Sequence, residues 1–582
     1  MTNASPPAAG AFTFVLHGHL PYVLTHGKWP HGSDMLFECA AESYLPLLQT
    51  FDRLVSEGIS PKVTFGITPI LAEQLADADF KSAFVEYLEE RSRTAGENRD
   101  EFTKHKQPHL ADLAEAWRRH FLSVRDSFRD QYGGDIIGGF RRLQNAGHIE
   151  VITSAATHGY LPLIGRDECV QAQVKQAVHA YQRHFGRPPR GFWLPECAYR
   201  PRYAWASPLP DAGPQEARVR KGVEEFLAEN GIEYFIVDTA TLLGGAAAGV
   251  YMERFPGLQH LWERFRASYR PGPVDAEKSP YEAYLVSSAA EDRPPVAVFT
   301  RDERTGIQVW SGEHGYPGDG WYLDFHKKHL PGGHRYWRVT SPQSDLASKE
   351  PYQPERAAER VPENADHFCS LVHDLLASHQ ARTGRYGILC APYDAELFGH
   401  WWYEGPEWLY RVLKGINSDP SVDLVTCSEY LEAHTPEMAV SLPESSWGQG
   451  GFHWIWLNEG TSGIWKHIYS DEAEMAALAE LAARSDGDLS RIARQAAREL
   501  LLLEASDWPF LISTWTARDY AERRAAFHHE AFSRLADIAR RKARGEELTT
   551  DDEAFLTSCS TRDAIFPDLD LSWWSGVERP AQ

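Results

Sequence analysis

The segment Gly191-Phe-Trp-Leu-Pro-Glu-Cys-Ala-Tyr199 places a carboxylate, Glu196, directly after a short apolar run. Similar β-branched or aromatic runs recur along the chain, each followed by a polar or Gly/Pro-containing break, and helical stretches lie between most of them. Strands that alternate with helices predict a parallel sheet, here long enough to close into a barrel of seven or eight strands. The runs occupy residues 12–16, 63–65, 150–153, 191–194, 234–237, 296–299, 386–390 and 424–426.

The sixth run has a second interpretation. Residues 306–310 follow residues 296–299 closely, and two such neighbouring runs can pair as a hairpin instead of entering a parallel sheet. The number of barrel strands therefore stays open at this point.

Polar groups follow five of the predicted strands. They are His17-Gly-His19, Thr157-His158-Gly159, Glu196, Asp238 and Asp394. The active sites of barrel enzymes are built at the carboxyl ends of the strands. We therefore expect these groups to converge, although they lie far apart in the sequence.

The 582 residues exceed the length at which a single hydrophobic core stops growing, so we expect more than one structural unit. A charged, helix-forming stretch predicts a helical insertion in the barrel, and amphipathic helical patterns replace the strand signals after about residue 430. The predicted division is a catalytic barrel at residues 1–80 and 143–430, the insertion at residues 81–142 and a helical domain at residues 431–582.

The composition restricts partner and location. A formal charge of −23, with Lys and Arg scattered among Asp and Glu, argues against nucleic acid or an anionic membrane, whereas a neutral polymer is not repelled. The seven cysteines form no Cys-x-x-Cys pair, which favours reduced thiols in a cytoplasmic protein. The first residues do not resemble a signal peptide, and no apolar stretch approaches the roughly 18 residues of a membrane span.

Glu196 has a counterpart in the segment Ala391-Pro-Tyr-Asp-Ala-Glu-Leu-Phe-Gly-His-Trp-Trp-Tyr-Glu-Gly405, where Asp394 stands among aromatic residues. Two such acids suit glycosidic-bond chemistry: one attacks the anomeric carbon or activates water, and the other moves a proton. Burial among rings raises the pKa of a carboxyl group toward general-acid use. Glu396 has no role that the sequence assigns beyond bracing the site.

Two further motifs leave alternatives open. His17-x-His19 can ligate a metal, with Asp238 or Asp394 as a further ligand, and that would make the chain a metal-dependent polysaccharide deacetylase. The same imidazoles can instead bind sugar hydroxyls or orient the carboxylates. The second motif is Trp447-Gly-Gln-Gly-Gly-Phe-His-Trp-Ile-Trp-Leu-Asn458. Its glycines can let the backbone and the Trp rings approach a ligand closely, or the segment can be a Gly-rich turn covered by Trp residues of the core.

Five segments together resemble glycoside hydrolase family 57, specifically its 1,4-α-glucan branching enzymes. They are residues 17–22, 157–160, 191–199, 391–405 and 447–458, and Leu501-Leu-Leu-Glu-Ala-Ser-Asp-Trp-Pro-Phe510 resembles the family's C-terminal helical segment. The resemblance covers nearly the whole chain. It implies a distorted (β/α)7 barrel with a helical insertion and an all-helical C-terminal domain that closes over the cleft, and retaining chemistry without a metal or other cofactor.

The resemblance also implies roles for individual residues. Glu196 matches the family's nucleophile and Asp394 its acid/base. Tyr251 resembles an aromatic residue on a loop that shields the intermediate from water. The positions that match glucan-contacting residues are His17, His19, Trp29, His158, Arg301, Trp310, Trp402, Trp447, Trp456 and Asp507.

These observations give the hypothesis of a double displacement. Glu196 attacks the anomeric carbon of an α-1,4-linked glucose while Asp394 protonates the departing O4, and Asp394 then deprotonates the O6 hydroxyl of an acceptor chain. The expected partner is an α-glucan such as amylose or a glycogen-like polymer. Within the family, a 4-α-glucanotransferase or an α-amylase-type hydrolase would use the same acids. The acid pair argues against a non-catalytic glucan-binding protein.

Overall fold

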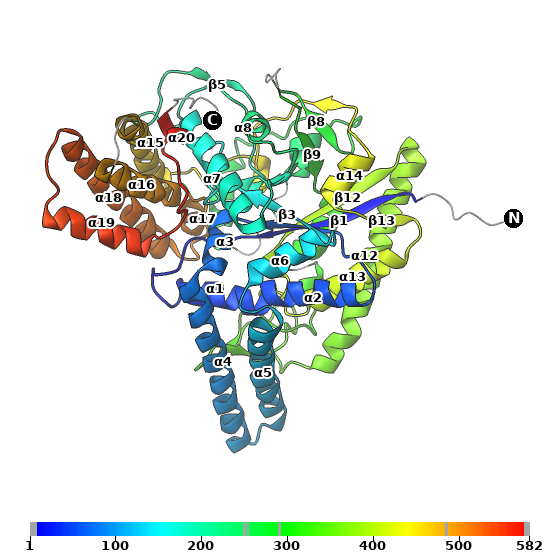
Figure 1. Cartoon of the computed structure of the whole chain (residues 1–582). Coiled ribbons are helices and arrows are strands. Elements are labelled where there is room, and N and C mark those ends of the chain that lie inside the picture. The colour runs from blue at the N-terminus through cyan, green and yellow to red at the C-terminus, as the bar shows by residue number, and fades with distance from the viewer. Residues whose placement is uncertain are drawn as a thin grey trace.

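The computed structural model describes residues 8–247, 249, 252, 255–288, 293–312, 314–483 and 487–575 (Figure 1). Within these ranges, seven parallel strands lie side by side in the order β12-β1-β2-β3-β4-β7-β9. A parallel bridge between Arg301 and Cys390 joins the two ends of this row, so the sheet closes into a barrel. The strands are β1 (Gly10–Gly18), β2 (Val63–Ile67), β3 (Ile149–Ser154), β4 (Gly191–Trp193), β7 (Tyr234–Val237), β9 (Ala297–Thr300) and β12 (Gly387–Asp394).

The barrel is distorted because its strands differ in length. β1 has nine residues, all of them buried, whereas β4 has three. Strands covered on both faces read as continuous apolar runs, which is why the sequence pattern located them. The predicted α/β fold, a distorted barrel followed by a helical C-terminal region, is confirmed.

The sheet continues beyond β9 through β8 (Tyr284–Val286), which is antiparallel to β9, and β14 (Ala439–Val440), which pairs with β8. The eighth predicted run, residues 424–426, overlaps only at Leu424 with β13 (Val422–Leu424), which pairs with β1 outside the barrel row. The alternative hairpin of residues 296–299 with residues 306–310 is wrong. The second run belongs to α11 (Glu303–Trp310), because the Asp302 side chain caps that helix by accepting from the Thr305 amide at 2.8 Å.

Helices cover the outside of the barrel (Figure 1). The helices in this part of the chain are α1 (Ser33–Cys39), α2 (Leu45–Ser56), α3 (Pro69–Ala76), α6 (Ile136–Asn145), α7 (Asp167–Phe185), α8 (Val223–Glu229), α9 (Thr239–Leu243), α10 (Pro256–Phe265), α11, α12 (Pro354–Thr383), α13 (Gly405–Ser418) and α14 (Cys427–Ala433), of which α10 packs on α17. Shorter helical turns are η1 (Ala40–Tyr44), η2 (Ser127–Gln131), η3 (Pro195–Cys197), η4 (Tyr316–Gly318), η5 (Ala395–Leu397) and η6 (Gln449–Gly451). Two separate ribbons pair β5 (Tyr203–Trp205) with β6 (Arg218–Arg220) and β10 (Lys328–His329) with β11 (His334–Arg335).

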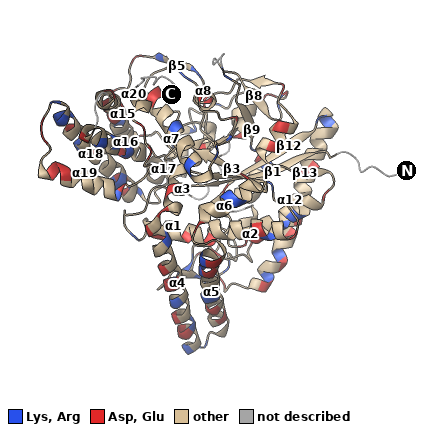
Figure 2. Ribbon diagram, viewed as in Figure 1, with Lys and Arg blue, Asp and Glu red and all other residues tan. Residues whose placement is uncertain are grey.

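A helical hairpin of α4 (Ala78–Lys104) and α5 (Pro108–Asp126) projects from the barrel (Figure 1). Its charged face consists of Lys and Arg interspersed with Asp and Glu (Figure 2). The hairpin is fastened at its inner side, where the Trp117 indole donates to the Arg335 carbonyl at 2.6 Å. The Asn98 amide donates to the Tyr336 hydroxyl at 3.0 Å.

The C-terminal part of the chain is helical and lies against the barrel on the side of α3 and α7 (Figure 1). The turn before α17 packs on the segment that follows β3, because the Ser506 amide donates to the His158 carbonyl at 3.0 Å. None of the helices in the described ranges has the length and apolar composition to cross a membrane. The helices are α15 (Ser462–Ala482), α16 (Asp488–Leu503), α17 (Asp507–Thr514), α18 (Arg518–Ala543), α19 (Thr550–Arg562) and α20 (Ser572–Ser575).

The turn that follows Asp394 depends on a glycine. Gly399 has a φ of +107°, and a Cβ atom there would lie 1.7 Å from the carbonyl oxygen of Glu42. No rotamer can relieve a clash between Cβ and backbone. This close approach holds the segment after β12 against η1.

We expect Gly399→Ala to lower Tm clearly, because the left-handed backbone and the clash together introduce strain of about 1–3 kcal/mol or more. Differential scanning calorimetry measures the change. Gly463→Ala in α15 is the matched control: its Cβ meets nothing within 4 Å, so its Tm should stay constant or rise. Equal Tm values for Gly399→Ala and the parent would contradict the expected strain.

Candidate active site

The predicted acids and histidines lie at the carboxyl ends of barrel strands. His17 is near the end of β1 and stands opposite Asp394, the last residue of β12, in the register of the two strands. His158 follows β3, and Glu196 lies in η3 just after β4. The structure therefore brings together groups that are separated by up to 377 positions in the chain, as the hydrogen bond from the His19 amide to Glu396 illustrates.

Glu196 is buried, and both of its carboxylate oxygens accept hydrogen bonds. The Trp447 indole donates to Oε2 at 2.8 Å, and the Ser506 hydroxyl donates to Oε1 at 3.1 Å. Its backbone φ is +60°, an uncommon conformation for a side-chain-bearing residue. The Trp447 amide also donates to the Glu196 carbonyl at 3.0 Å, which holds this turn in place.

Burial raises the pKa of Glu196 from 4.5 to about 7. The hydrogen bonds from Trp447 and Ser506 act in the opposite direction, because they stabilise the ionised form. Without these two donors the carboxyl group would be still harder to ionise. The site thus contains a carboxylate that is available near neutral pH and fixed in orientation.

A chain of hydrogen bonds leads from His17 to Glu196. The two Nε2 atoms of His17 and His158 are 3.1 Å apart, and His158 Nδ1 is 2.7 Å from the Ser506 hydroxyl oxygen. Burial lowers the pKa of His17 and of His158 well below 6.5, so both rings are neutral.

The directions of these bonds follow from Ser506. Its only proton is donated to Glu196, so its oxygen accepts from His158 Nδ1–H. His158 Nε2 is then an acceptor, and it accepts from His17 Nε2–H. Each member donates toward the carboxylate, and the chain ends on the Glu196 oxygen.

His19 completes the histidine group. Its ring stacks on that of His158 with centroids 4.0 Å apart, and its Nε2 lies 3.0 Å from Asp507 Oδ2. Since a carboxylate accepts, His19 donates from Nε2 to Asp507, and its Nδ1 lies 3.1 Å from the Thr68 hydroxyl oxygen. Asp507 opens α17, so the C-terminal helices contribute directly to this end of the barrel.

Asp394 stands at the boundary between β12 and η5, and its side chain is partly exposed. Burial raises the pKa of the Cys197 thiol, and the negative charges of Glu196 and Asp394 raise it further, so both acids lie around this residue. Glu396 is buried and braces the site as expected, because its Oε1 accepts from the His19 amide at 2.9 Å and from the Tyr44 hydroxyl.

Three of the predicted binding residues surround the carboxylates. The Trp447 ring meets Trp193 and Trp310 edge to face, at centroid distances of 5.5 and 6.4 Å. Arg301 is buried in an ion pair with Asp238. Trp193 and Trp310 are themselves fully buried, so in this structure they pack behind Trp447, and the charge of Arg301 is compensated internally.

Two predicted binding residues lie in the core. Trp402 is 1% exposed and packs among Tyr316, Tyr322 and Trp408. Trp456 is also 1% exposed and stacks on Tyr160 at 4.6 Å. Both rings support the site from below and present no face to a ligand in this structure.

One predicted residue, Trp29, lies away from this site. Trp29 is 77% exposed on the segment between β1 and α1, where it lines a separate groove. Tyr251 is outside the described residues.

Ser506 is the residue that the sequence did not single out. It joins His158 to Glu196 and directly precedes Asp507, which was predicted. Its position next to Asp507 in the segment 501–510 could have indicated a role in the site. A serine after a helix, however, is common for reasons unrelated to catalysis. Trp193 was included only as part of the segment around Glu196. In the structure its ring stacks on the His17 ring at a centroid distance of 4.5 Å.

The metal hypothesis takes a different form in the structure. The ligand atoms of His19, His158 and Asp507 lie within 4.8 Å of one another and could hold an ion. The predicted set was His17 and His19 with Asp238 or Asp394, and of these residues His19 belongs to this cluster. Asp238 is instead paired with Arg301, because the two face each other in the barrel interior.

A parallel barrel with a fixed, buried glutamate after β4 and an aspartate at the end of β12, both at the carboxyl ends of the strands, is typical of an enzyme of the glycoside hydrolase type. The model of glycosyl hydrolase family 57 matches residues 13–443, and that of the C-terminal region of 1,4-α-glucan branching enzymes matches residues 467–574. The chain belongs to glycosyl hydrolase family 57 and, within it, to the branching enzymes.

Individual relatives agree with this assignment. A 1,4-α-glucan branching enzyme of Thermococcus kodakarensis is 44% identical over 91% of this chain and 73% of its own length. A probable branching enzyme of Mycobacterium tuberculosis is 31% identical over 94% of this chain and 97% of its own.

Solved structures agree as well. The crystal structure of the Thermococcus kodakaraensis branching enzyme in complex with glucose gives a TM-score of 0.87 at 41% identity, covering 98% of this chain and 97% of that one. The α-amylase AmyC of Thermotoga maritima gives 0.77 at 29% identity, covering 98% and 100%.

We expect Ser506→Ala to move the acidic limb of the kcat/KM profile to higher pH. Ser506 donates to the ionised form of Glu196, so its removal makes the carboxyl group bind its proton more tightly. Loss of one charge-assisted hydrogen bond corresponds to a shift of about one pH unit. Rates measured between pH 5 and pH 9 test this.

Ser513→Ala is the matched control for that measurement. Ser513 lies in the same helix, α17, and its hydroxyl donates to the Ile455 carbonyl at 2.6 Å, away from the carboxylate. Its acidic limb should coincide with that of the parent. An unmoved limb in Ser506→Ala would mean that the hydroxyl does not set the ionisation of Glu196.

Proposed function

We propose that this chain cleaves α-1,4 glucosidic bonds by a retaining double displacement and transfers the released chain to a 6-hydroxyl, forming α-1,6 branches. The observation that carries the proposal is the fixed position of Glu196 between Ser506 and Trp447, at the barrel end where Asp394 also lies. Membership of the branching enzymes supports the choice of transfer over hydrolysis. The chain is a glucan-acting enzyme.

In the first step, a Glu196 oxygen forms a bond to the anomeric carbon while the bond from that carbon to O4 breaks. Asp394, protonated, gives its proton to O4. Glu196 is suited to attack because its oxygens accept from Ser506 and Trp447 and keep further lone pairs for the sugar. Retention requires the carboxyl groups to lie about 5–5.5 Å apart, against roughly 6.5–9.5 Å for inversion.

In the second step, Asp394 removes the proton from the O6 hydroxyl of an acceptor chain. The O6 atom bonds to the anomeric carbon, and the bond to Glu196 breaks. The partly exposed position of Asp394 supports this exchange role, because the residue must reach both the leaving and the entering oxygen.

The neutral histidines supply hydrogen bonds without charge. Burial holds the pKa of His17 and of His158 below its usual value, so the two rings orient Ser506 and Glu196 through hydrogen bonds without forming an ion pair with the carboxylate. This leaves the negative charge of Glu196 available to the anomeric centre. His19, fixed by Asp507 and Thr68, lines the same side.

Transfer instead of hydrolysis requires that water be excluded from the glycosyl-enzyme. The burial of Glu196 against Trp447 and the turn at Ser506 supports such exclusion, and Trp193 and Trp310 pack against the Trp447 ring. The shielding role of Tyr251 stays a prediction.

A neutral polymer such as amylose or a glycogen-like chain is the proposed substrate. The glucan sites named above contain neutral histidines, tryptophans and one compensated ion pair, a set of groups that suits uncharged sugars. A cytoplasmic location remains our proposal, and the seven cysteines, all free thiols, support it.

We expect the parent enzyme, incubated with amylose, to give a product that releases new short chains on treatment with a debranching enzyme. Glu196→Gln should lower this activity by about 1,000-fold or more, because the nucleophile is lost. Chain lengths are compared by chromatography before and after debranching. Glu437→Gln, at an exposed position, is the matched control and should be fully active.

Reducing ends that appear without releasable short chains would make the enzyme a hydrolase and would contradict the proposal. Linear products of altered length would make it a 4-α-glucanotransferase.

We further expect activity to survive exhaustive dialysis against EDTA. The nitrogens that a metal would need are already engaged: His158 Nε2 accepts from His17, and His19 Nε2 donates to Asp507. Metal content and branching activity are measured on the same samples. Stoichiometric zinc that is lost together with activity would place an ion at His19, His158 and Asp507 and favour the deacetylase class.

A further inference from the structure

Two tryptophans differ from all the others in exposure. The chain has 19 tryptophans, all within the described ranges, and only Trp29 at 77% and Trp515 at 54% expose more than half of their surface. The rest are buried or partly buried. An exposed aromatic ring has no packing role that explains it, so a shared location for these two would indicate a binding surface.

Both rings line the same groove. It has a volume of about 470 Å³ and lies between residues 26–32, which connect β1 to α1, and residues 515–523, which join α17 to α18. Pockets of roughly 300–1,000 Å³ are typical of ligand sites. Its walls thus come from the barrel part and the helical C-terminal part of the chain.

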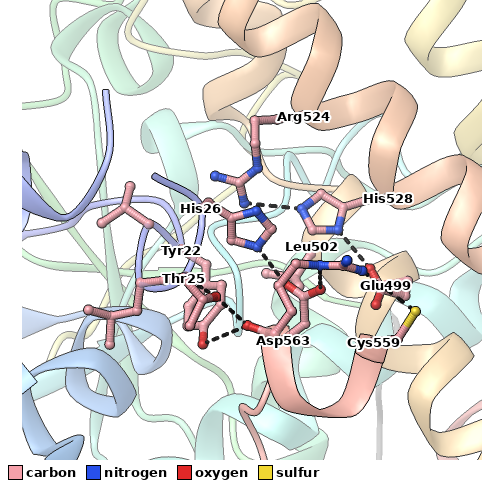
Figure 3. Close-up of polar contacts among 12 residues, drawn as sticks. Tyr22, Thr25, His26, Glu499, Leu502, Arg524, His528, Cys559 and Asp563 are labelled. Carbon is pink, nitrogen blue, oxygen red and sulfur yellow. Dashed lines mark hydrogen bonds and ion pairs between the residues drawn. The ribbon is translucent and has the colours of Figure 1, made fainter. Parts of the chain in front are cut away.

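A buried polar network holds the two walls together (Figure 3). On the barrel side, His26 Nε2 lies 2.6 Å from Asp563 Oδ1. On the helical side, Arg524 donates to His528 Nε2 at 3.1 Å and to the Tyr520 hydroxyl at 2.7 Å.

The network is closed by further contacts. His528 Nδ1 lies 2.8 Å from Glu499, and the hydrogen bond to His26 helps to lower the pKa of Asp563 to about 2 despite its burial. Asp563 therefore stays ionised and bound to His26. The groove is preformed, and ligand binding need not order its walls first.

Trp515 is held in an unusual backbone conformation. Its φ is +62°, in the left-handed region that favours glycine, at the residue where α17 ends. The Trp515 ring packs against α10, where its centroid lies 6.0 Å from that of His260, but it stays 54% exposed, so packing compensates little of this strain. This combination indicates a constraint from function.

The charges around the groove do not select an ionic ligand. Lys28 is paired with Glu90 at 3.3 Å, and Arg518 with Glu522 at 2.8 Å. Arg523 donates to the Asp519 carbonyl at 3.2 Å. With its cations engaged, the groove offers aromatic faces and hydrogen-bonding groups, which suit a neutral sugar chain.

The groove is one short helix away from the reacting centre. α17 has eight residues, begins at Asp507 beside His19 and ends before Trp515, a rise of about 12 Å. A chain bound along this helix could therefore extend from the catalytic end of the barrel to the groove.

We propose that Trp29 and Trp515 form a clamp that binds a stretch of α-glucan remote from the bond being cleaved. The inference rests on the proposed glucan-transfer function and adds to it a distal subsite in which Trp515 is the second stacking face. Binding energy from such a remote contact is available only to chains long enough to reach it. The clamp therefore makes the enzyme select for long chains.

The test uses Trp515→Gly, because glycine suits the left-handed backbone and removes the ring without adding strain. The change is made in a Glu196→Gln background so that substrate is bound but not consumed. Isothermal titration with a long linear α-1,4 oligosaccharide should show about tenfold weaker binding, the effect of losing one stacked ring. Maltotriose, too short to span α17 and the groove, should bind with unchanged affinity.

Companion variants separate the clamp from general damage. Trp29→Ala should reproduce the selective loss, and Trp515→Phe should restore part of the long-chain affinity because it keeps an aromatic face. Leu346→Ala, which truncates a 52% exposed side chain outside the groove, should bind both ligands like the parent.

The outcomes distinguish this proposal from the function on which it rests. Unchanged long-chain affinity in Trp515→Gly, or an equal loss for maltotriose, would overturn the clamp even if amylose is branched normally. Failure to branch amylose, with long-chain binding that still depends on Trp515, would support the clamp and overturn the proposed function.

Discussion

The hydrogen bond from Ser506 to Glu196 is the interaction on which the site depends. It fixes the carboxylate, sets the direction of the bonds through His158 and His17, and requires the turn before α17 to lie against the barrel. A single hydroxyl can donate only once. Because that proton goes to Glu196, the tautomers of both imidazoles are determined, and the catalytic end of the barrel and the C-terminal helices form one structure.

Burial and hydrogen bonding oppose each other at Glu196. Removal from water raises its pKa, and with the hydrogen bonds from Trp447 and Ser506 in place the pKa is about 7. The Trp447 and Ser506 donors limit this effect and orient the group at the same time. Closing the site against water and keeping its nucleophile ionised are thus achieved by the same residues, and neither donor can be exchanged for an apolar group without affecting both.

Much of the fold could be predicted from the sequence, because strands buried on both faces read as continuous apolar runs and polar groups follow them. The positions of Glu196, Asp394 and His158 at strand ends follow from that pattern. Burial of individual rings could not be predicted: Trp402 and Trp456 resemble Trp447 in the sequence, yet they pack in the core. Ser506 was missed because its role arises from the packing of α16 and α17 on the segment after β3, which no local pattern encodes. The exposure of Trp515 likewise depends on how one helix ends.

The contribution of residues near the C-terminus to the catalytic end has a consequence during protein synthesis. The chain grows from the N-terminus, and the barrel strands emerge well before Ser506 and Asp507. Until these residues leave the ribosome and the α16–α17 turn docks on the segment after β3, His158 lacks its acceptor and Glu196 lacks one of its two donors. A nascent barrel therefore has its acids in place but an incomplete pocket, and a polymer in the surrounding solution meets an organised nucleophile only after the ribosome has made most of the molecule.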